Sequence, residues 1–329
     1  MSPKKVKTFI YKSFNIDSTN GAFHISYEYE IPGQVTFKHY IDIPKKEFKF
    51  RPTNSNLIQC LVFNIGMIVM FDYWILDSTH NINIECCSLD DNQINWWKEY
   101  CLSAFNKEIE LSSDKDKHIP IEKIIYDDND FSGYVVSIDN QSACVTLETL
   151  NLDRESDFCL IINPTSTSKE LASISGFNDN NIIEVTQIYD EKLIKKNNHN
   201  ESELIAFVGY FLSFLLSKKY VAVSNQSYSK TFGRSLDFEN RFRTYADKYL
   251  PTPIEYFSYL RPLNNLQVLC TFAKLQKYHP LYNSHKNLNL KLDSQVKPKI
   301  AASKFKSSYY IKENNLIPEQ EFQLKKFFL

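Results

Sequence analysis

Four short apolar runs in the second half of the chain are separated by stretches that carry apolar residues at helical spacing. The runs are short and apolar enough to predict buried strands, and they lie at 134–136, 159–162, 182–185 and 220–223. The stretches between them, at 143–150, 171–176 and 203–216, predict helices. Strands and helices that alternate at this spacing predict an α/β fold with a mostly parallel sheet and flanking helices.

The polar loop between the first of these strands and its helix is the most informative segment of the sequence. A loop at this place in an α/β sheet usually holds a ligand, often a phosphate at the start of the helix. A phosphate cradle normally uses glycines, which allow a positive φ and a close approach of the backbone. The chain has only seven glycines in 329 residues, and none lies between Ser137 and Leu150. The segment therefore has the strand–loop–helix order of a nucleotide-binding site but lacks the glycines that usually bind the phosphates.

The amino-terminal part is predicted to be rich in β-structure. Apolar residues alternate with polar ones over 23–31 and 35–43, and Pro32-Gly33 between them has turn chemistry, which predicts a β-hairpin. Residues 51–76 predict a buried helix. A membrane span is not predicted there, because it needs about 20 nearly unbroken apolar residues and this run contains polar ones such as Asp72.

Further along, Asp90 and Gln93 have the spacing of a helix capping box. A charged, serine-rich connector at 111–117 then marks a boundary between two modules. We predict an α+β module with the hairpin over 1–118, an α/β domain over 119–285 and a basic tail over 286–329.

Composition limits the classes of partner. The formal net charge is −1, so no overall field attracts nucleic acid or an anionic membrane, and neither is predicted as a partner. The seven cysteines show no C-x-x-C spacing, which suits a reducing cytoplasm better than a secreted disulfide scaffold. Isolated histidines are a weak metal signal, and no metal site is predicted.

An ordered set of segments resembles one family, the MurL-type ATP-dependent epimerases, which invert the terminal L-glutamate of UDP-N-acetylmuramoyl-L-alanyl-L-glutamate, a peptidoglycan precursor. The resemblance covers most of the chain up to about residue 285. It is strongest at Tyr256-Phe257-Ser258-Tyr259-Leu260-Arg261-Pro262-Leu263. The other segments are Asn64-Ile65-Gly66-Met67, Tyr73-Trp74, Leu89 to Lys98, Val145-Thr146-Leu147-Glu148, Asn163-Pro164-Thr165, Val223-Ser224-Asn225, Phe238-Glu239 and Leu266-Gln267.

The resemblance implies an ATP-pyrophosphatase domain of the PP-loop type, with a HUP-like sheet and a Gly-Gly-Gly-Lys-Asp-Ser loop after its first strand. ATP and Mg²⁺ would be the cofactors if the activity of the family is retained. Carried over without gaps, the loop falls on Ile138, Asp139, Asn140, Gln141, Ser142 and Ala143, and every position differs. Gln141 stands where the phosphate-binding lysine is expected, and Ser142 stands where the aspartate is expected.

Several polar residues follow the predicted strands or fall on motifs of the family. Candidates for a catalytic role are Lys230, Arg234 and Arg261, and candidates for binding are Asn163, Thr165, Ser224, Asn225 and His199. Each has a structural alternative. Asp139 and Ser142 are of the types that cap helices. Arg261 either clamps a phosphate or carboxylate of a ligand, or forms a structural salt bridge at a strand end.

Three hypotheses for function stay open at this stage. The departures from the family concentrate on polar residues while the apolar frame is kept, which favours a MurL-like pseudoenzyme that binds a UDP-muramyl-peptide-like molecule or a protein partner. The second hypothesis is an active epimerase, or a ligase-like enzyme, with a rearranged ATP site. The third is an enzyme repurposed around Asp139, Lys230 and Arg261.

Overall fold

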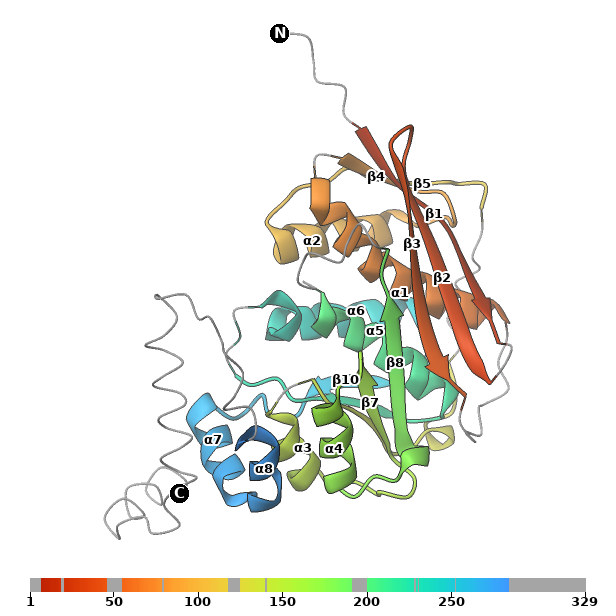
Figure 1. Ribbon diagram of the computed structural model, residues 1–329. Coiled ribbons are helices and arrows are strands. Elements are labelled where there is room, and N and C mark those ends of the chain that lie inside the picture. The colour runs from red at the N-terminus through yellow and green to blue at the C-terminus, as the bar shows by residue number, and fades with distance from the viewer. Residues whose placement is uncertain are drawn as a thin grey trace.

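The computed structural model describes residues 7–18, 21–45, 55–78, 80–117, 125–139, 141–190, 200–227, 229, 231–251 and 253–283. These residues form one ten-stranded sheet with helices packed against it (Figure 1). The order of the strands is β10-β9-β6-β7-β8-β3-β2-β1-β4-β5. Most of the paired strands are parallel, so the predicted α/β class is confirmed.

The parallel half of the sheet contains the four predicted strands and one more. Its strands are β6 (Tyr134–Ser137), β7 (Phe158–Ile162), β8 (Ile182–Ile188), β9 (Tyr220–Val223) and β10 (Glu255–Ser258). The chain moves outward from β6 through β7 to β8, then returns to the other side of β6 to form β9 and β10. The strand order therefore reverses between β6 and β9, and ligands of open α/β sheets bind at the carboxyl end of such a switch point.

Helices cover both faces of this half. One face packs against α3 (Ala143–Thr149), α4 (Ser166–Ile174), α7 (Asn265–Lys274) and the short α8 (His279–Asn283). The opposite face packs against α5 (Glu201–Leu215) and α6 (Leu236–Tyr249). Gly209 lets α5 approach the sheet closely, because a Cβ at this position would lie 2.7 Å from Cγ1 of Val221.

The amino-terminal part extends the same sheet. Its strands are β1 (Lys7–Asp17), β2 (Ala22–Ile31), β3 (Val35–Pro44), β4 (His80–Ile84) and β5 (Leu111–Ser113). β2 and β3 form the predicted hairpin, with Gly33 in the turn at a φ of 71°. The antiparallel pairing of β3 with β8, which sets Tyr40 opposite Ile188, joins the two halves. The division at 118 and 285 stays a prediction, and the tail at 286–329 lies outside the described residues.

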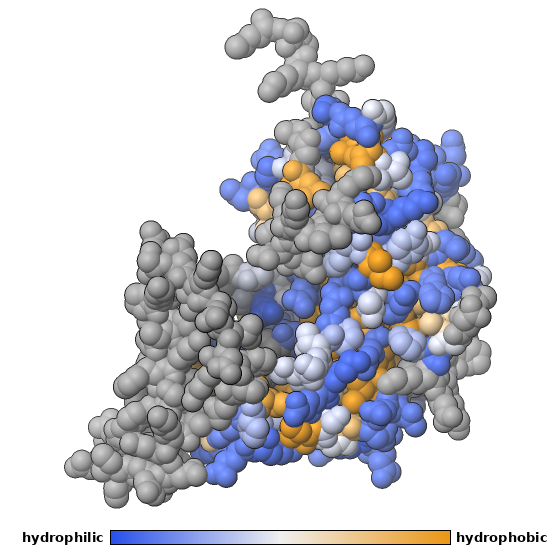
Figure 2. All heavy atoms as spheres, viewed as in Figure 1, coloured by the Kyte–Doolittle hydropathy of each residue, from blue (hydrophilic) through white to orange (hydrophobic). Residues whose placement is uncertain are grey.

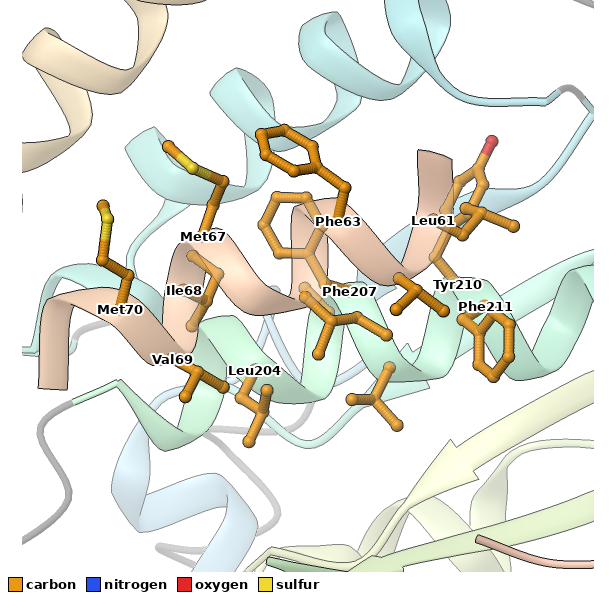
Figure 3. Packing of buried hydrophobic residues seen from close by; sticks show 14 of the residues in the cluster. Leu61, Phe63, Met67, Ile68, Val69, Met70, Leu204, Phe207, Tyr210 and Phe211 are labelled. Carbon is orange, nitrogen blue, oxygen red and sulfur yellow. The ribbon is translucent and has the colours of Figure 1, made fainter. Parts of the chain in front are cut away.

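Helix α1 (Ser55–Trp74) is the centre of the larger hydrophobic core. It packs on β1 and β2 and runs alongside α5 in the opposite direction, with Met67, Met70, Leu204 and Phe207 among the side chains of this cluster (Figure 3). A Cβ at Gly66 would collide with the hydroxyl of Tyr11, so this glycine permits the close contact with the sheet.

Among the described residues, α1 is the helix that is long and apolar enough to cross a membrane. However, 89% of its 18-residue apolar window is buried inside the protein, as expected for the core helix of a soluble protein. The predicted buried helix is therefore confirmed. On the face shown in Figure 2, hydrophilic residues predominate and hydrophobic ones are scattered among them.

Helix α2 (Asp91–Phe105) follows β4 and packs its aromatic side chains against the same core. Asp90 accepts a hydrogen bond from the Gln93 backbone, and Gln93 accepts one from the Asp90 backbone, so the predicted capping box is confirmed.

Candidate functional site

The carboxyl ends of the parallel strands carry three neighbouring crevices around the loop that follows β6. One of about 230 Å³ lies towards β7 and α4, one of about 300 Å³ lies between β6 and β9, and one of about 230 Å³ lies towards α7. Gln141 lines all three. The predicted loop therefore lies at the switch point of the sheet, where a ligand is expected.

The loop itself is occupied by its own side chains. Ile138 and Ala143 are buried, and the backbone N–H of Ile138 donates to the carbonyl of Leu160 at 2.9 Å, so the strand pairing continues into the loop. The side chain of Asp139 is only 2% exposed, and its Oδ2 lies 3.4 Å from Nη2 of Arg234. Asn140 lies outside the described residues.

Ser142 stands immediately before α3 and binds a side chain from the next strand. Its Oγ accepts a hydrogen bond of 2.7 Å from Nε2 of Gln226, which follows β9. Its side chain makes no capping bond to α3, so the capping alternative is wrong for this residue. This bond holds the loops after β6 and β9 together across the switch point.

Arg261, just after β10, binds protein groups on both sides of its guanidinium. Nη1 donates to the carbonyls of Gln226 at 2.7 Å and Arg234 at 2.9 Å. Nη2 donates to Oε2 of Glu239 and to Oγ of Ser258, both at 2.9 Å. The buried Glu239 carboxylate therefore balances the charge of Arg261 inside the protein, as in the structural salt bridge that was one of the two alternatives.

Arg234 ends the 3-10 helix η5 (Phe232–Arg234) and lines the crevice of 300 Å³. Its Nε donates to Oγ of Ser202 at 3.0 Å, and its Nη2 faces Asp139. Glu201 lines the neighbouring crevice, and burial together with the Asp139 carboxylate raises its pKa while Arg234 opposes the rise. The guanidinium is thus shared among groups of the chain, and one third of the side chain remains exposed.

Ser224 and Asn225 follow β9 and differ in whether their polar atoms are already hydrogen-bonded within the protein. Ser224 is buried, and its Oγ donates to Oγ1 of Thr146 in α3 at 2.9 Å. Asn225 donates from Nδ2 to Oγ of Ser258 at 3.3 Å. Its Oδ1 is buried and has no hydrogen-bond partner among the described residues, although the side chain lines the 300 Å³ crevice. A buried amide oxygen without a partner is uncommon in folded proteins.

Asn163 and Thr165, which line the crevice towards β7, have structural bonds. Asn163 has a φ of 51°, and its Oδ1 accepts from the backbone N–H of Gln187 at 2.9 Å. Thr165 caps α4 through a capping box with Ser168. The structure therefore brings both candidates to the predicted edge of the sheet, but it gives each a local role.

Two candidates, Lys230 and His199, lie outside the described residues. Two residues that were not predicted as site residues prove central to the arrangement, namely Gln226 and Glu239. Glu239 has a sequence signal, because Arg243 follows it at the i,i+4 spacing of helical ion pairs, and the two form a bond of 2.8 Å. The sequence shows no comparable signal for Gln226.

The strand order and the loops at the switch point define an α/β protein of the doubly wound class. The sequence model of the MurL N-terminal domain matches residues 1–203, which is more than half of the chain, and the protein belongs to the MurL family. It is thereby related to the epimerases of peptidoglycan precursors. Comparisons with curated proteins and with solved structures found no match. The family match ends in the first turn of α5, so β9, Arg234 and Arg261 lie beyond it.

Proposed function

We propose that this MurL-family protein binds a UDP-muramyl-peptide-like molecule at the carboxyl edge of its sheet and does not activate it with ATP. The observation that carries the proposal is the loop after β6, which is filled by Ile138 and Ala143 and tied by Asp139 to Arg234. The protein would then act in the cytoplasm as a pseudoenzyme, consistent with its free cysteines.

The residues at the loop do not fit the triphosphate of ATP. Adenylation of a carboxylate develops negative charge on the phosphates, and preorganised donors must stabilise it. The loop offers neither a glycine nor a lysine at 138–143. The guanidinium of Arg261 is already paired with the buried Glu239. Arg234, which faces Asp139 and keeps one third of its side chain exposed, offers a single positive charge against the several negative charges of a triphosphate.

The same edge retains the features of a binding site for a polar molecule. The crevice of 300 Å³ is lined by the polar residues Ser229, Gln226 and Asn225, and the one beside it adds apolar contacts from Val268 and Phe272. A polar floor beside an apolar wall suits a ligand with both kinds of group. The partly exposed Arg234 is the group that would meet a carboxylate of the peptide.

Calorimetric titration of the full chain with UDP-N-acetylmuramoyl-L-alanyl-L-glutamate tests the proposal. We expect saturable binding with the same affinity whether or not ATP and Mg²⁺ are present. Arg234→Gln should weaken binding about tenfold or more, the loss expected for a charge-assisted hydrogen bond. Arg241→Gln is the matched control, because Arg241 lies on α6 and pairs at the surface with Asp237 and Glu99.

Other outcomes would favour the alternatives. Binding that requires ATP and Mg²⁺ would favour an active enzyme with a rearranged site. A lack of binding to the muramyl peptide would refute the proposed ligand and favour a protein-interaction module.

A further inference from the structure

A fourth cavity, of about 270 Å³, lies next to the crevices at the carboxyl edge of the sheet, since Glu203 and Thr231 in its lining are two residues from Glu201 and Ser229, which line them. It is bordered by the 3-10 helix η1 (Ile75–Asp77) after α1, the end of α2, the start of α5 and the turn η5. Its lining residues are Ile75, Ala104, Phe105, Asn200, Glu203, Thr231 and Phe232, none of which lines the three crevices described above. Because α1 and α5 run in opposite directions, the end of one and the start of the other meet here (Figure 3).

Glu203 is the unusual group in this cavity. Its side chain is almost completely buried, and Oε2 has no hydrogen-bond partner among the described residues. The chain makes room for the carboxyl at Gly233, where a Cβ would collide with it. A buried carboxyl oxygen without a partner is rare in folded proteins and calls for a water, an ion or a ligand.

Two more polar groups lie near Glu203, namely a second carboxyl and a hydroxyl without a hydrogen-bond partner among the described residues. Asn200 donates from Nδ2 to Oδ1 of Asp72 at 3.2 Å, which places a second carboxyl beside the cavity. The hydroxyl of Tyr100 is buried and has no hydrogen-bond partner among the described residues. Burial, followed by the charges of Glu203 and Asp72, raises the pKa of Tyr100 well above its ordinary value.

Arg234 is the positive charge that acts on Glu203, but its guanidinium contacts other residues. Its Nε donates to Ser202 and its Nη2 faces Asp139. Burial raises the pKa of Glu203 to about 8, with a further rise from Asp72. The backbone N–H of Glu203 itself, the charge of Arg234 and the backbone N–H of Gly233 lower it and offset this rise only in part. The Glu203 carboxyl therefore carries its negative charge above about pH 8, where it loses its proton.

Aromatic rings complete the walls. The ring centroid of Tyr100 lies 5.8 Å from that of Phe232 and 6.1 Å from that of Phe105, each in an edge-to-face arrangement. Aromatic rings next to a carboxylate are surroundings that suit an organic cation, whose apolar part packs against the rings while its charge meets the carboxylate. A metal ion is not favoured, because the described residues provide no cluster of three or more metal-binding side chains.

We propose that this cavity binds a small organic ammonium ion, with its nitrogen against the Glu203 carboxylate and its apolar part against Ile75, Ala104 and Phe105. A volume of 270 Å³ corresponds to roughly nine water molecules at about 30 Å³ each, which suits a short alkylamine. The cavity shares no lining residue with the crevices at the edge of the sheet, so its occupancy is tested separately from the proposed function.

The test is calorimetric titration of the full chain at pH 9 with n-butylammonium chloride, with n-butanol as a neutral probe of similar size. At this pH the Glu203 carboxyl is ionised and the alkylammonium ion keeps its proton. We expect saturable binding of the ammonium ion and none of the alcohol. Glu203→Gln keeps the shape of the side chain and removes its charge, and it should weaken binding about tenfold or more. Ala104→Leu fills the cavity and should weaken binding without changing any charge.

Glu99→Gln is the control for charge, because Glu99 lies on the same helix as Ala104 but is exposed and pairs with Arg241. Circular dichroism shows whether each variant is folded. Equal binding of the ammonium ion and the alcohol, or unchanged binding by folded Glu203→Gln, would overturn the proposal. Absence of saturable binding to the unaltered protein would also overturn it and would mean that the cavity holds water only.

Discussion

Replacing Glu203 by glutamine should stabilise the protein at alkaline pH. Burial raises the pKa of this carboxyl from its ordinary 4.5 to about 8 in the folded chain. Each pKa unit corresponds to about 1.4 kcal/mol, so ionisation of Glu203 in the folded protein carries a penalty of roughly 5 kcal/mol. Glutamine has nearly the same shape and no charge to bury, so it removes this penalty.

The sign follows from which state releases its proton first. Below about pH 4.5 the carboxyl is protonated in both states, and its titration does not change the free energy of unfolding. Between pH 4.5 and 8 the unfolded chain ionises while the folded chain keeps the proton, so the unaltered protein loses stability as the pH rises. Above pH 8 both states are ionised and the loss is complete.

Urea unfolding of the two proteins at a series of pH values from 4.5 to 9 measures the effect. The difference in the free energy of unfolding, variant minus unaltered protein, should rise from near zero to roughly 5 kcal/mol across this window. Glu201→Gln is the comparison variant. Burial also raises the pKa of Glu201, but this side chain is only half-buried, so the change of stability with pH should be smaller than for Glu203→Gln. A Glu203→Gln difference that stays constant with pH would refute the reasoning.

Two further predictions concern packing and the arginine at the sheet edge. Arg261→Ala should lower the free energy of unfolding by about 3 kcal/mol, because it removes one partner of the buried Glu239 carboxylate, and Arg261→Lys should recover little since it cannot reproduce the forked set of bonds. Urea unfolding at pH 7 checks both variants, and a loss below about 1 kcal/mol would contradict the buried-pair argument. Gly209→Ala should lower the free energy of unfolding by about 1–3 kcal/mol, because the new Cβ collides with Val221. In a Val221→Ala background the same change should cost less, so the loss in the double variant should be smaller than the sum of the two single losses. Additive losses in this double-mutant cycle would mean that the two residues do not compete for the same space.

The local part of the fold was predictable from the sequence. The strands at 134–136 and 220–223 and the hairpin around Gly33 follow from patterns that span a few residues, and the structure contains them. Helix α6 was not predicted, although Phe238, Phe242, Tyr245 and Tyr249 have the spacing of an apolar helical face. The pairing of β3 with β8 was beyond such patterns, because it joins residues about 150 positions apart.

The site shows the same limit. The position of the loop at 138–143 was predictable, because the carboxyl ends of parallel strands meet at one edge. The pairing of Asp139 with Arg234 was not, since these residues come from different loops far apart in the chain. Glu203 had a signal that was not used, namely a charged residue at the start of a strongly apolar helix, where full burial is unusual for a carboxyl.

Release of pyrophosphate is the most direct test of the central claim that this family member has lost the activation of its substrate by ATP. The assay uses the purified full chain with ATP, Mg²⁺ and UDP-N-acetylmuramoyl-L-alanyl-L-glutamate. The account predicts no release of pyrophosphate or AMP above that of a sample without protein. Equimolar release of AMP and pyrophosphate, abolished by Asp139→Asn, would contradict it.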